Sequence, residues 1–178
     1  MNADSTSTPE RTGLREAARA PFEDYSDEHR PLGPYAALSA AFWITVSGSA
    51  LALRAAGKSL PDRIDAGDVA LAGVATHKIS RLLAKDKVTS FIRAPFTEYQ
   101  GPGGPGEVEE KPRGSGLRHA IGELLVCPYC LGMWVAAGYG IGHVGAPRAT
   151  RLVGFVFTAL TISDSLQIAY KAAEEKGL

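Results

Sequence analysis

Residues 35–53 read YAALSAAFWITVSGSALAL, a run of 19 residues without a charged side chain. At a rise of about 1.5 Å per residue such a helix extends about 28 Å, close to the roughly 30 Å hydrocarbon core of a bilayer. Three further stretches of 19 mostly apolar or small residues follow, at 66–84, 124–142 and 152–170. This repeated length predicts an all-α fold, a multi-pass membrane bundle of about four helices.

Polar segments surround and divide these apolar stretches. Residues 1–33 form a polar N-terminal tail that we expect to be disordered, and residues 172–178 form a polar C-terminal tail. The membrane domain between them, residues 34–171, is interrupted at 100–117, where Gly and Pro occur together with mixed charge. Such a composition favours an unstructured loop. The loop would separate two pairs of helices.

Composition and motifs exclude several classes of function. Lys and Arg number 19 and Asp and Glu number 19, so the chain has no basic excess and we expect no nucleic-acid partner. No apolar core of signal-peptide length lies near the start, so the first apolar stretch is expected to act as an uncleaved anchor. Walker-type phosphate loops, H-E-x-x-H zinc motifs and G-x-S-x-G elbows are absent. We therefore favour a non-enzymatic component in contact with membrane lipids, with a second copy or another membrane protein as its partner.

Lys and Arg outside the apolar stretches are distributed unequally. Twelve lie in the N-terminal tail, the loop between the second and third stretches and the C-terminal tail, whereas five lie in the other two loops. Positively charged loops are retained in the cytoplasm. We therefore expect a protein of the inner (cytoplasmic) membrane with both termini on the cytoplasmic side.

The second stretch, 66–84, differs from the others because it carries charges. Asp68 lies near its start, and His77, Lys78 and Arg81 lie toward its end. A charge at the centre of a bilayer costs about 2.5–3.5 kcal/mol on insertion scales. We therefore expect this helix to be short or partly interfacial, with its long basic side chains reaching the headgroups.

An alternative interpretation places polar side chains inside the bundle. His77 and Arg81 are four residues apart and share a helix face. Glu123 lies at the head of the third stretch and Asp164 within the fourth. An acid inside a bundle is usually matched by a base or a polar cavity. These four residues form a candidate buried polar cluster in which Asp164 would pair with Arg81.

Basic residues lie near the end of the second stretch and after it, and two interpretations stay open for them. They either anchor the chain to lipid headgroups or bind an anionic ligand. Pro95 disfavours helix at Ala94, so the chain should turn here and bring Arg93 to the lipid phosphates. The candidate residues are Lys78, Lys85, Lys87 and Arg93.

The tetrapeptide CPYC at residues 127–130 contains both cysteines, Cys127 and Cys130, and admits three interpretations. Two thiols at this spacing at a helix N-terminus are suited to disulfide exchange. A zinc site would use both thiolates and two more ligands, for which His119 is a candidate. As a structural element, Pro128 would kink or begin a helix while the cysteines pack against a neighbour. No cofactor is predicted, zinc stays an alternative, and the cytosol would keep both thiols reduced.

Five short motifs occur in an order that resembles one family. They read HKISRL from residue 77, KDKVT from 85, RAPFT from 93, GELL from 122 and CPYCLG from 127. Over about residues 66–170 the chain is similar to the bacterial membrane family called domain of unknown function 1360. The resemblance implies a multi-pass membrane protein without an established activity, and no catalytic residue is carried over. Three classes thus stay open: an interaction component, a membrane thiol-disulfide oxidoreductase, and a small transporter or metal-handling protein.

Overall fold

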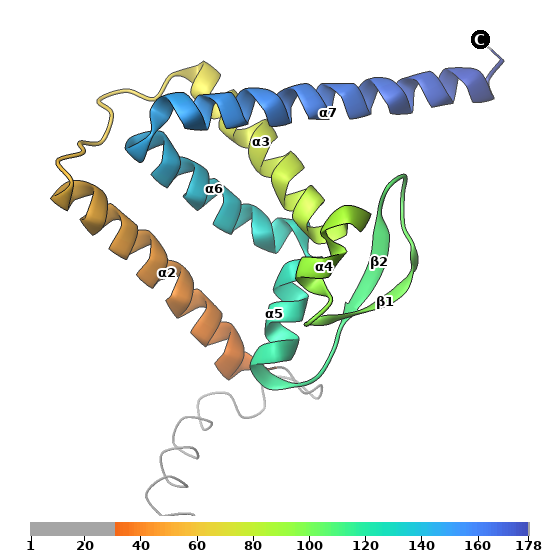
Figure 1. Ribbon diagram of the computed structural model, residues 1–178, viewed down its shortest axis with the longest axis horizontal. Helices are drawn as coiled ribbons and strands as arrows, with labels where there is room; N and C mark the ends of the chain where they lie inside the picture. The colour runs from red at the N-terminus through yellow and green to blue at the C-terminus, as the bar shows by residue number, and fades with distance from the viewer. Residues whose placement is uncertain (1–30, 178) are drawn as a thin grey trace, which may run out of the picture.

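The computed structural model describes residues 31–177. Helix dominates, as the sequence predicts, and the described residues add one two-stranded antiparallel sheet (Figure 1). In chain order the elements are α2 (Leu32–Ala55), α3 (Ala66–Lys85), the 3-10 helix η2 (Lys87–Thr89), α4 (Ser90–Arg93), β1 (Thr97–Pro102), β2 (Val108–Pro112), α5 (Gly116–Val126), α6 (Pro128–Gly145) and α7 (Pro147–Glu175).

Helices α2 and α7 are each long and apolar enough to cross a membrane. Together, α5 and α6 would supply a third span if their bent pair is counted as one. Within residues 31–177 the structure therefore holds two such helices, or up to three, and the predicted bundle of four spans is not confirmed. The remaining predicted span is α3, whose charges lower its hydropathy.

Helix α3 lies between α6 and α7 (Figure 1). Asp68 near the start of α3 contacts Arg151 near the start of α7, and Lys78 farther along contacts Asp164 of α7. Helices α3 and α7 therefore run in the same direction. Against α6, α3 runs in the opposite direction, because Asp68 lies 3.8 Å from His143 near the end of α6.

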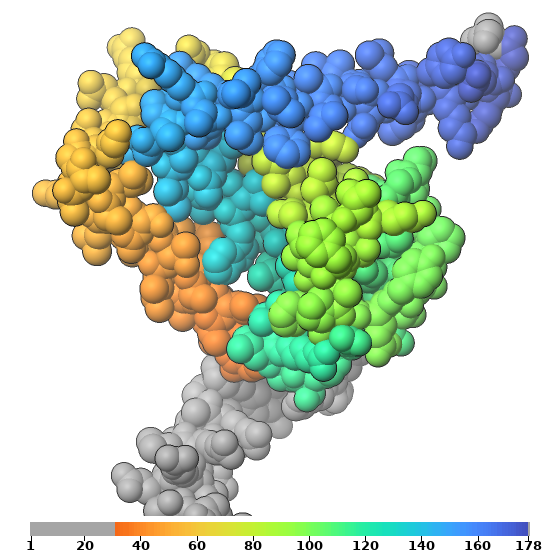
Figure 2. Space-filling view, in the orientation of Figure 1, coloured from red at the N-terminus to blue at the C-terminus, as the bar shows by residue number. Residues whose placement is uncertain are grey.

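Helix α2 contacts the bundle along one side only. The rings of Phe42 in α2 and Trp134 in α6 meet edge to face with centroids 5.2 Å apart. Farther along both helices, Leu53 lies 3.2 Å from the position that a Cβ would take at Gly145. The two helices therefore run in the same direction, while the outer face of α2, including Trp43, is exposed. Figure 2 shows α2 standing partly apart from α6 and the C-terminal half of α7 extending beyond the rest of the molecule.

The third apolar stretch is two helices and not one. Cys127 has an extended backbone (φ −104°, ψ 102°) and separates α5 from α6. Pro128 has no N–H to continue the hydrogen bonding of α5 and disfavours helical backbone at the residue before it. The two helix axes consequently meet at 83°.

The Gly/Pro-rich segment at 100–117 is not an unstructured loop, which corrects the expectation from its composition. Strand β1 pairs with β2 from Thr97 opposite Pro112 to Pro102 opposite Val108. Gly106, in the connection between the strands, has a φ of +78°, a conformation that favours glycine. Its carbonyl accepts a hydrogen bond from the N–H of Lys87, which ties the turn to the end of α3.

The predicted tails are only partly described. Residues 1–30 of the polar N-terminal tail lie outside the described residues, and Leu32 and Gly33 already belong to α2. At the other end, α7 continues to Glu175, so most of the predicted C-terminal tail is helical.

Candidate functional site

Every charged side chain of α3 lies beside an opposite charge. The guanidinium of Arg151 donates two hydrogen bonds to the carboxylate of Asp68, Nε to Oδ1 at 2.8 Å and Nη2 to Oδ2 at 2.7 Å. Because an unpaired charge in apolar surroundings is costly, this pairing explains how a helix with four charges packs among apolar helices. The remaining pairs are Lys78 with Asp164, Arg81 with Glu107, and Lys85 with Glu109.

The structure gives two members of the predicted polar cluster different partners from those expected. Asp164 contacts Lys78, whereas the Nε of Arg81 lies 2.7 Å from Glu107 Oε1. The expected pair of Arg81 with Asp164 is therefore not the pair in the structure, and the His77 side chain is exposed. The hairpin explains the difference, because its Glu107 lies next to Arg81 at the end of α3, whereas Asp164 of α7 lies next to Lys78, one turn earlier.

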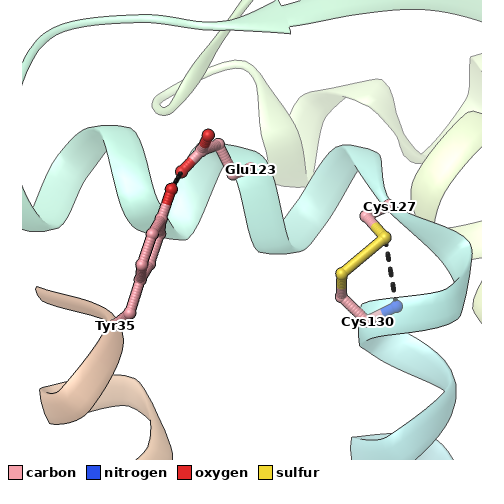
Figure 3. Close-up of a disulfide and its surroundings, with 4 residues drawn as sticks. All are labelled: Tyr35, Glu123, Cys127 and Cys130. Carbon is pink, nitrogen blue, oxygen red and sulfur yellow. Dashed lines mark hydrogen bonds between the residues drawn. A yellow bond between two sulfur atoms is a disulfide. The ribbon is translucent and has the colours of Figure 1, made fainter. Parts of the chain in front are cut away.

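Glu123, the fourth member of that cluster, lies on α5 close to the first turn of α2. Its carboxylate accepts a hydrogen bond from the hydroxyl of Tyr35 (Figure 3). The Nε2 of His119, one turn earlier on α5, lies 3.7 Å from the other carboxylate oxygen. Glu123 thus joins α2 to α5 and lies apart from the α3–α7 contacts.

The hairpin cap, which we define as residues 86–122, is built around a buried arginine. Arg93 is 0% exposed, and its Nε contacts the carboxylate of Glu110 on β2, itself only 5% exposed. The other guanidinium donors reach Leu83 O at 2.7 Å, Thr89 Oγ1 at 2.8 Å and Asp86 O at 2.9 Å. Arg93 therefore joins α3, η2 and β2, which corrects the expectation that it faces lipid phosphates.

Ion pairs within the chain occupy most of the basic residues that were predicted to bind an anion. Lys78, Lys85 and Arg93 each face a carboxylate of the chain, and among the described residues only Lys87 of this set has no ion pair. The hydrogen bond from Lys85 lowers the pKa of the exposed Glu109 carboxyl. Lys85 and Arg93 thus pair with glutamates of the hairpin, whereas Lys78 pairs with Asp164 of α7.

Helix α5 rests directly on the base of the hairpin. A Cβ at Gly122 would lie 2.6 Å from the carbonyl oxygen of Phe96 and 3.0 Å from Cβ of Pro112. The first distance is too short for a side chain and the second is tighter than ordinary contact, so glycine is needed for this approach. The hairpin is thereby fixed to α5, the helix that leads into the CPYC motif.

At the bend between α5 and α6, Cys127 and Cys130 form a disulfide (Figure 3). Cys127 is the N-cap residue of α6, and its Sγ accepts a hydrogen bond from the N–H of Cys130 at 3.2 Å. Tyr129 is 91% exposed and Cys130 is exposed as well. The bond is thus open to a reaction partner, although the sequence favoured reduced thiols.

The structure does not bring His119, the additional ligand expected for a zinc site, to the two cysteines of CPYC. His119 lies beside Glu123 and has no contact with either cysteine. Within residues 31–177, no group of three or more His, Cys, Asp or Glu side chains is placed to hold a metal ion.

A second polar site, missed by the sequence reading, lies at the opposite end of α3. Asp68, Arg151 and His143 line an open cleft of about 630 Å³ together with Arg63 and Asp65. Asp68, His143 and Arg151 come from the ends of three helices, and Arg63 and Asp65 come from the connection that leads into α3. Their meeting could have been expected from the predicted topology, which places those helix ends on one side.

This fold defines a mostly helical protein with two helices suited to cross a membrane, a charged central helix and a hairpin cap that leads into an exposed CPYC disulfide. The chain belongs to the family described as protein of unknown function (DUF1360), whose pattern matches residues 71–170. The matched region begins within α3 and includes the whole cap and both cysteines.

Two proteins of Bacillus subtilis (strain 168) are similar to parts of the chain. UPF0713 protein YngL is 34% identical over 76 residues, which are 42% of this chain and 56% of that protein. Sporulation protein YjcA is 34% identical over 86 residues, which are 47% of this chain and 73% of that protein. The chain thus spans little more than half the length of the first of these relatives. No solved structure matches it.

Proposed function

We propose that the protein is a multi-pass component of the cytoplasmic membrane that acts without catalysis, by packing against a second copy or another membrane protein. The observation that carries this proposal is the uncovered apolar surface of α2 and α7. In each helix, only 6% of the most apolar 18-residue window is buried within the chain. Apolar surface of this extent needs lipid or a partner to cover it.

The helix directions support the topology expected from the Lys and Arg distribution. Helices α2 and α6 run one way and α3 and α7 run the other, as four alternating spans would. In this arrangement the hairpin cap and the CPYC bend lie on the cytoplasmic side, and the Asp68 cleft lies on the outer side. Both chain ends then face the cytoplasm.

Insertion and partnership are tested separately. For this topology we expect the full chain to resist alkaline extraction. In intact spheroplasts, reporter tags should be accessible in the loop at 56–65 and inaccessible in the cap. A photo-crosslinking side chain at Phe155 or Leu166, both exposed on α7, should then yield a discrete protein adduct in native membranes. The same group at Phe42, an aromatic side chain only 7% exposed, is the matched control and should give none.

Two differently tagged copies of the chain identify the partner in that adduct. An adduct that carries both tags indicates a second copy, and an adduct with one tag indicates another membrane protein. Recovery of the chain in the soluble fraction, or crosslinks to lipid alone from both positions of α7, would contradict the proposal.

A second candidate, thiol-disulfide exchange, is favoured by the exposed disulfide at the N-terminus of α6. A thiolate of a dithiol substrate would attack one sulfur of the Cys127–Cys130 bond and form a mixed disulfide. This attack releases the other cysteine as a thiolate. The second substrate thiolate would then attack the substrate sulfur of the mixed disulfide and release the remaining cysteine, leaving an oxidised substrate and two reduced cysteines. Two electrons pass to the motif, and the reverse reaction would reduce a disulfide substrate.

Cysteine substitutions distinguish this activity from packing. If exchange is the function, Cys127→Ser and Cys130→Ser should each abolish oxidation of a dithiol peptide by the purified chain. If the cysteines only pack, a single Cys130→Ala should leave both the fold and the crosslinking of α7 unchanged.

A further inference from the structure

Two arginines in the hairpin cap converge on one backbone carbonyl. Arg118 donates to Pro95 O from Nε at 2.9 Å and from Nη2 at 2.7 Å. Arg113 donates to the same oxygen from Nε and Nη2, both at 3.3 Å. Because one oxygen accepts from both groups, the two guanidinium charges lie side by side.

These two charges are not neutralised within the described part of the chain. Of the other Lys and Arg side chains in the cap and at the adjoining end of α3, all but Lys87 form an ion pair with a carboxylate. These are Arg81, Lys85, Arg93 and Lys111. No carboxylate of residues 31–177 forms an ion pair with Arg113 or Arg118. In both arginines the Nη1 donor has no hydrogen bond among the described residues.

The local backbone holds Arg118 in this position. Gly114 has a φ of +78°, and a Cβ there would lie 3.0 Å from Cδ of Arg118. The arginine side chain therefore folds back over a residue that has to be glycine to reach Pro95 O. Two like charges are thus kept together, which is unfavourable unless an anion joins them.

A phosphate group has the chemistry to join them. A guanidinium presents its donors as a planar fork that matches the oxygens of phosphate. A phosphate keeps at least two non-bridging oxygens, one for each arginine, whereas a single carboxylate is filled by one fork. The free donors of the pair therefore favour a phosphate ligand.

The position of the pair brings it to lipid, if the chain lies in the membrane as proposed above. Arg113 and Arg118 flank the start of α5, and α5 joins the first turn of α2 through Glu123 and Tyr35. The pair therefore lies at the level where α2 begins, which is the headgroup layer for a spanning helix. Leu117, beside Arg118, is 51% exposed, as suits contact with lipid at that depth.

From this geometry we infer that Arg113 and Arg118 form a clamp for a phosphate group, supplied by the headgroup of an anionic phospholipid. The test uses the full chain in a glycoside detergent that contains no phosphate, with phosphatidylglycerol added in one arm and inorganic phosphate in another. Affinity is measured for each arm. The double variant Arg113→Gln/Arg118→Gln is compared with Lys87→Gln/Lys111→Gln, which removes the same charge from the same cap.

We expect phosphatidylglycerol to bind the wild type and the lysine variant alike, and to bind the arginine variant at least about tenfold more weakly, about 1.4 kcal/mol. Arg113→Lys/Arg118→Lys keeps the charge without the forks and should also bind weakly, which separates the clamp from loss of folding. Competition by inorganic phosphate at millimolar concentration would support the clamp with a soluble phosphate as well.

Equal weakening in the lysine and arginine variants would overturn the inference, because it would reduce the effect to net charge. Unchanged binding in the arginine variant would overturn it too. Neither outcome bears on the membrane location, since the inorganic phosphate arm needs no lipid and alkaline extraction is scored independently.

Discussion

Replacing Arg93 by methionine tests whether the hairpin cap is held by its buried charge. Methionine is long and apolar but lacks the guanidinium, so Glu110 would keep its charge at 5% exposure without a partner. Removing one partner of a buried ion pair typically costs about 3–5 kcal/mol. The carbonyls of Leu83 and Asp86 also lose donors at 2.7 and 2.9 Å. We therefore expect the free energy of opening of the cap to fall by about 3–5 kcal/mol, which raises its open population by about 150- to 5,000-fold.

Hydrogen exchange of the purified chain in detergent measures this change residue by residue. Amides of the paired strands at 97–112 should lose protection in Arg93→Met, whereas amides in the middle of α2 should keep theirs. Replacing both members of the pair, Arg93→Met with Glu110→Leu, removes the orphaned carboxylate and should restore much of the protection. A loss below about 1 kcal/mol in the single variant, or an equal loss in the double variant, would refute the reasoning.

Three further perturbations test other contacts. Gly122→Ala should destabilise the cap by about 1–3 kcal/mol because its methyl group would overlap the hairpin base, whereas Gly138→Ala, with open space around it, should leave the thermal midpoint unchanged or raise it. A double-mutant cycle on Lys78 and Asp164 should give a coupling energy of about 0.5–3 kcal/mol, and additive effects would contradict the pairing in the structure. The lowered pKa of the Glu109 carboxyl means that its ion pair stabilises the cap at neutral pH and stops doing so as pH falls through that pKa; Glu109→Gln should therefore flatten the acid side of the profile of thermal midpoint against pH.

Apolar length alone is sufficient to predict the first two helices. Residues 35–53 and 66–84 correspond to α2 and α3 within three residues at either end. Apolar length could not predict that the third stretch divides into two helices, because the break depends on the extended backbone of a single residue, Cys127. Pro128 is the signal for that break, since proline is tolerated in the first turn of a helix and disrupts its interior.

The partners of the charged residues could not be predicted in the same way. An ion pair between α3 and the hairpin depends on the register of β1 with β2 and on where the cap rests, neither of which leaves a periodic signal. Because the acidic residues at 107–110 lie in a Gly/Pro-rich segment, the composition predicted an unstructured loop there. These acidic residues are the complement of Arg81, Lys85 and Arg93, and this complementarity is visible only once the cap is folded.

The positions of the ion pairs along α3 bear on what covers the protein. Asp68 lies near one end of the helix, and Arg81 and Lys85 lie near the other. In the proposed membrane arrangement, water or headgroups would be within reach of both ends. Lys78 lies between them, and its partner Asp164 is 48% exposed in the isolated chain. A carboxylate with that exposure on an apolar helix is unfavourable against lipid. A partner helix with a polar side chain would relieve this cost, so the half-exposed Asp164 argues, independently of the apolar area, for a protein partner along α7.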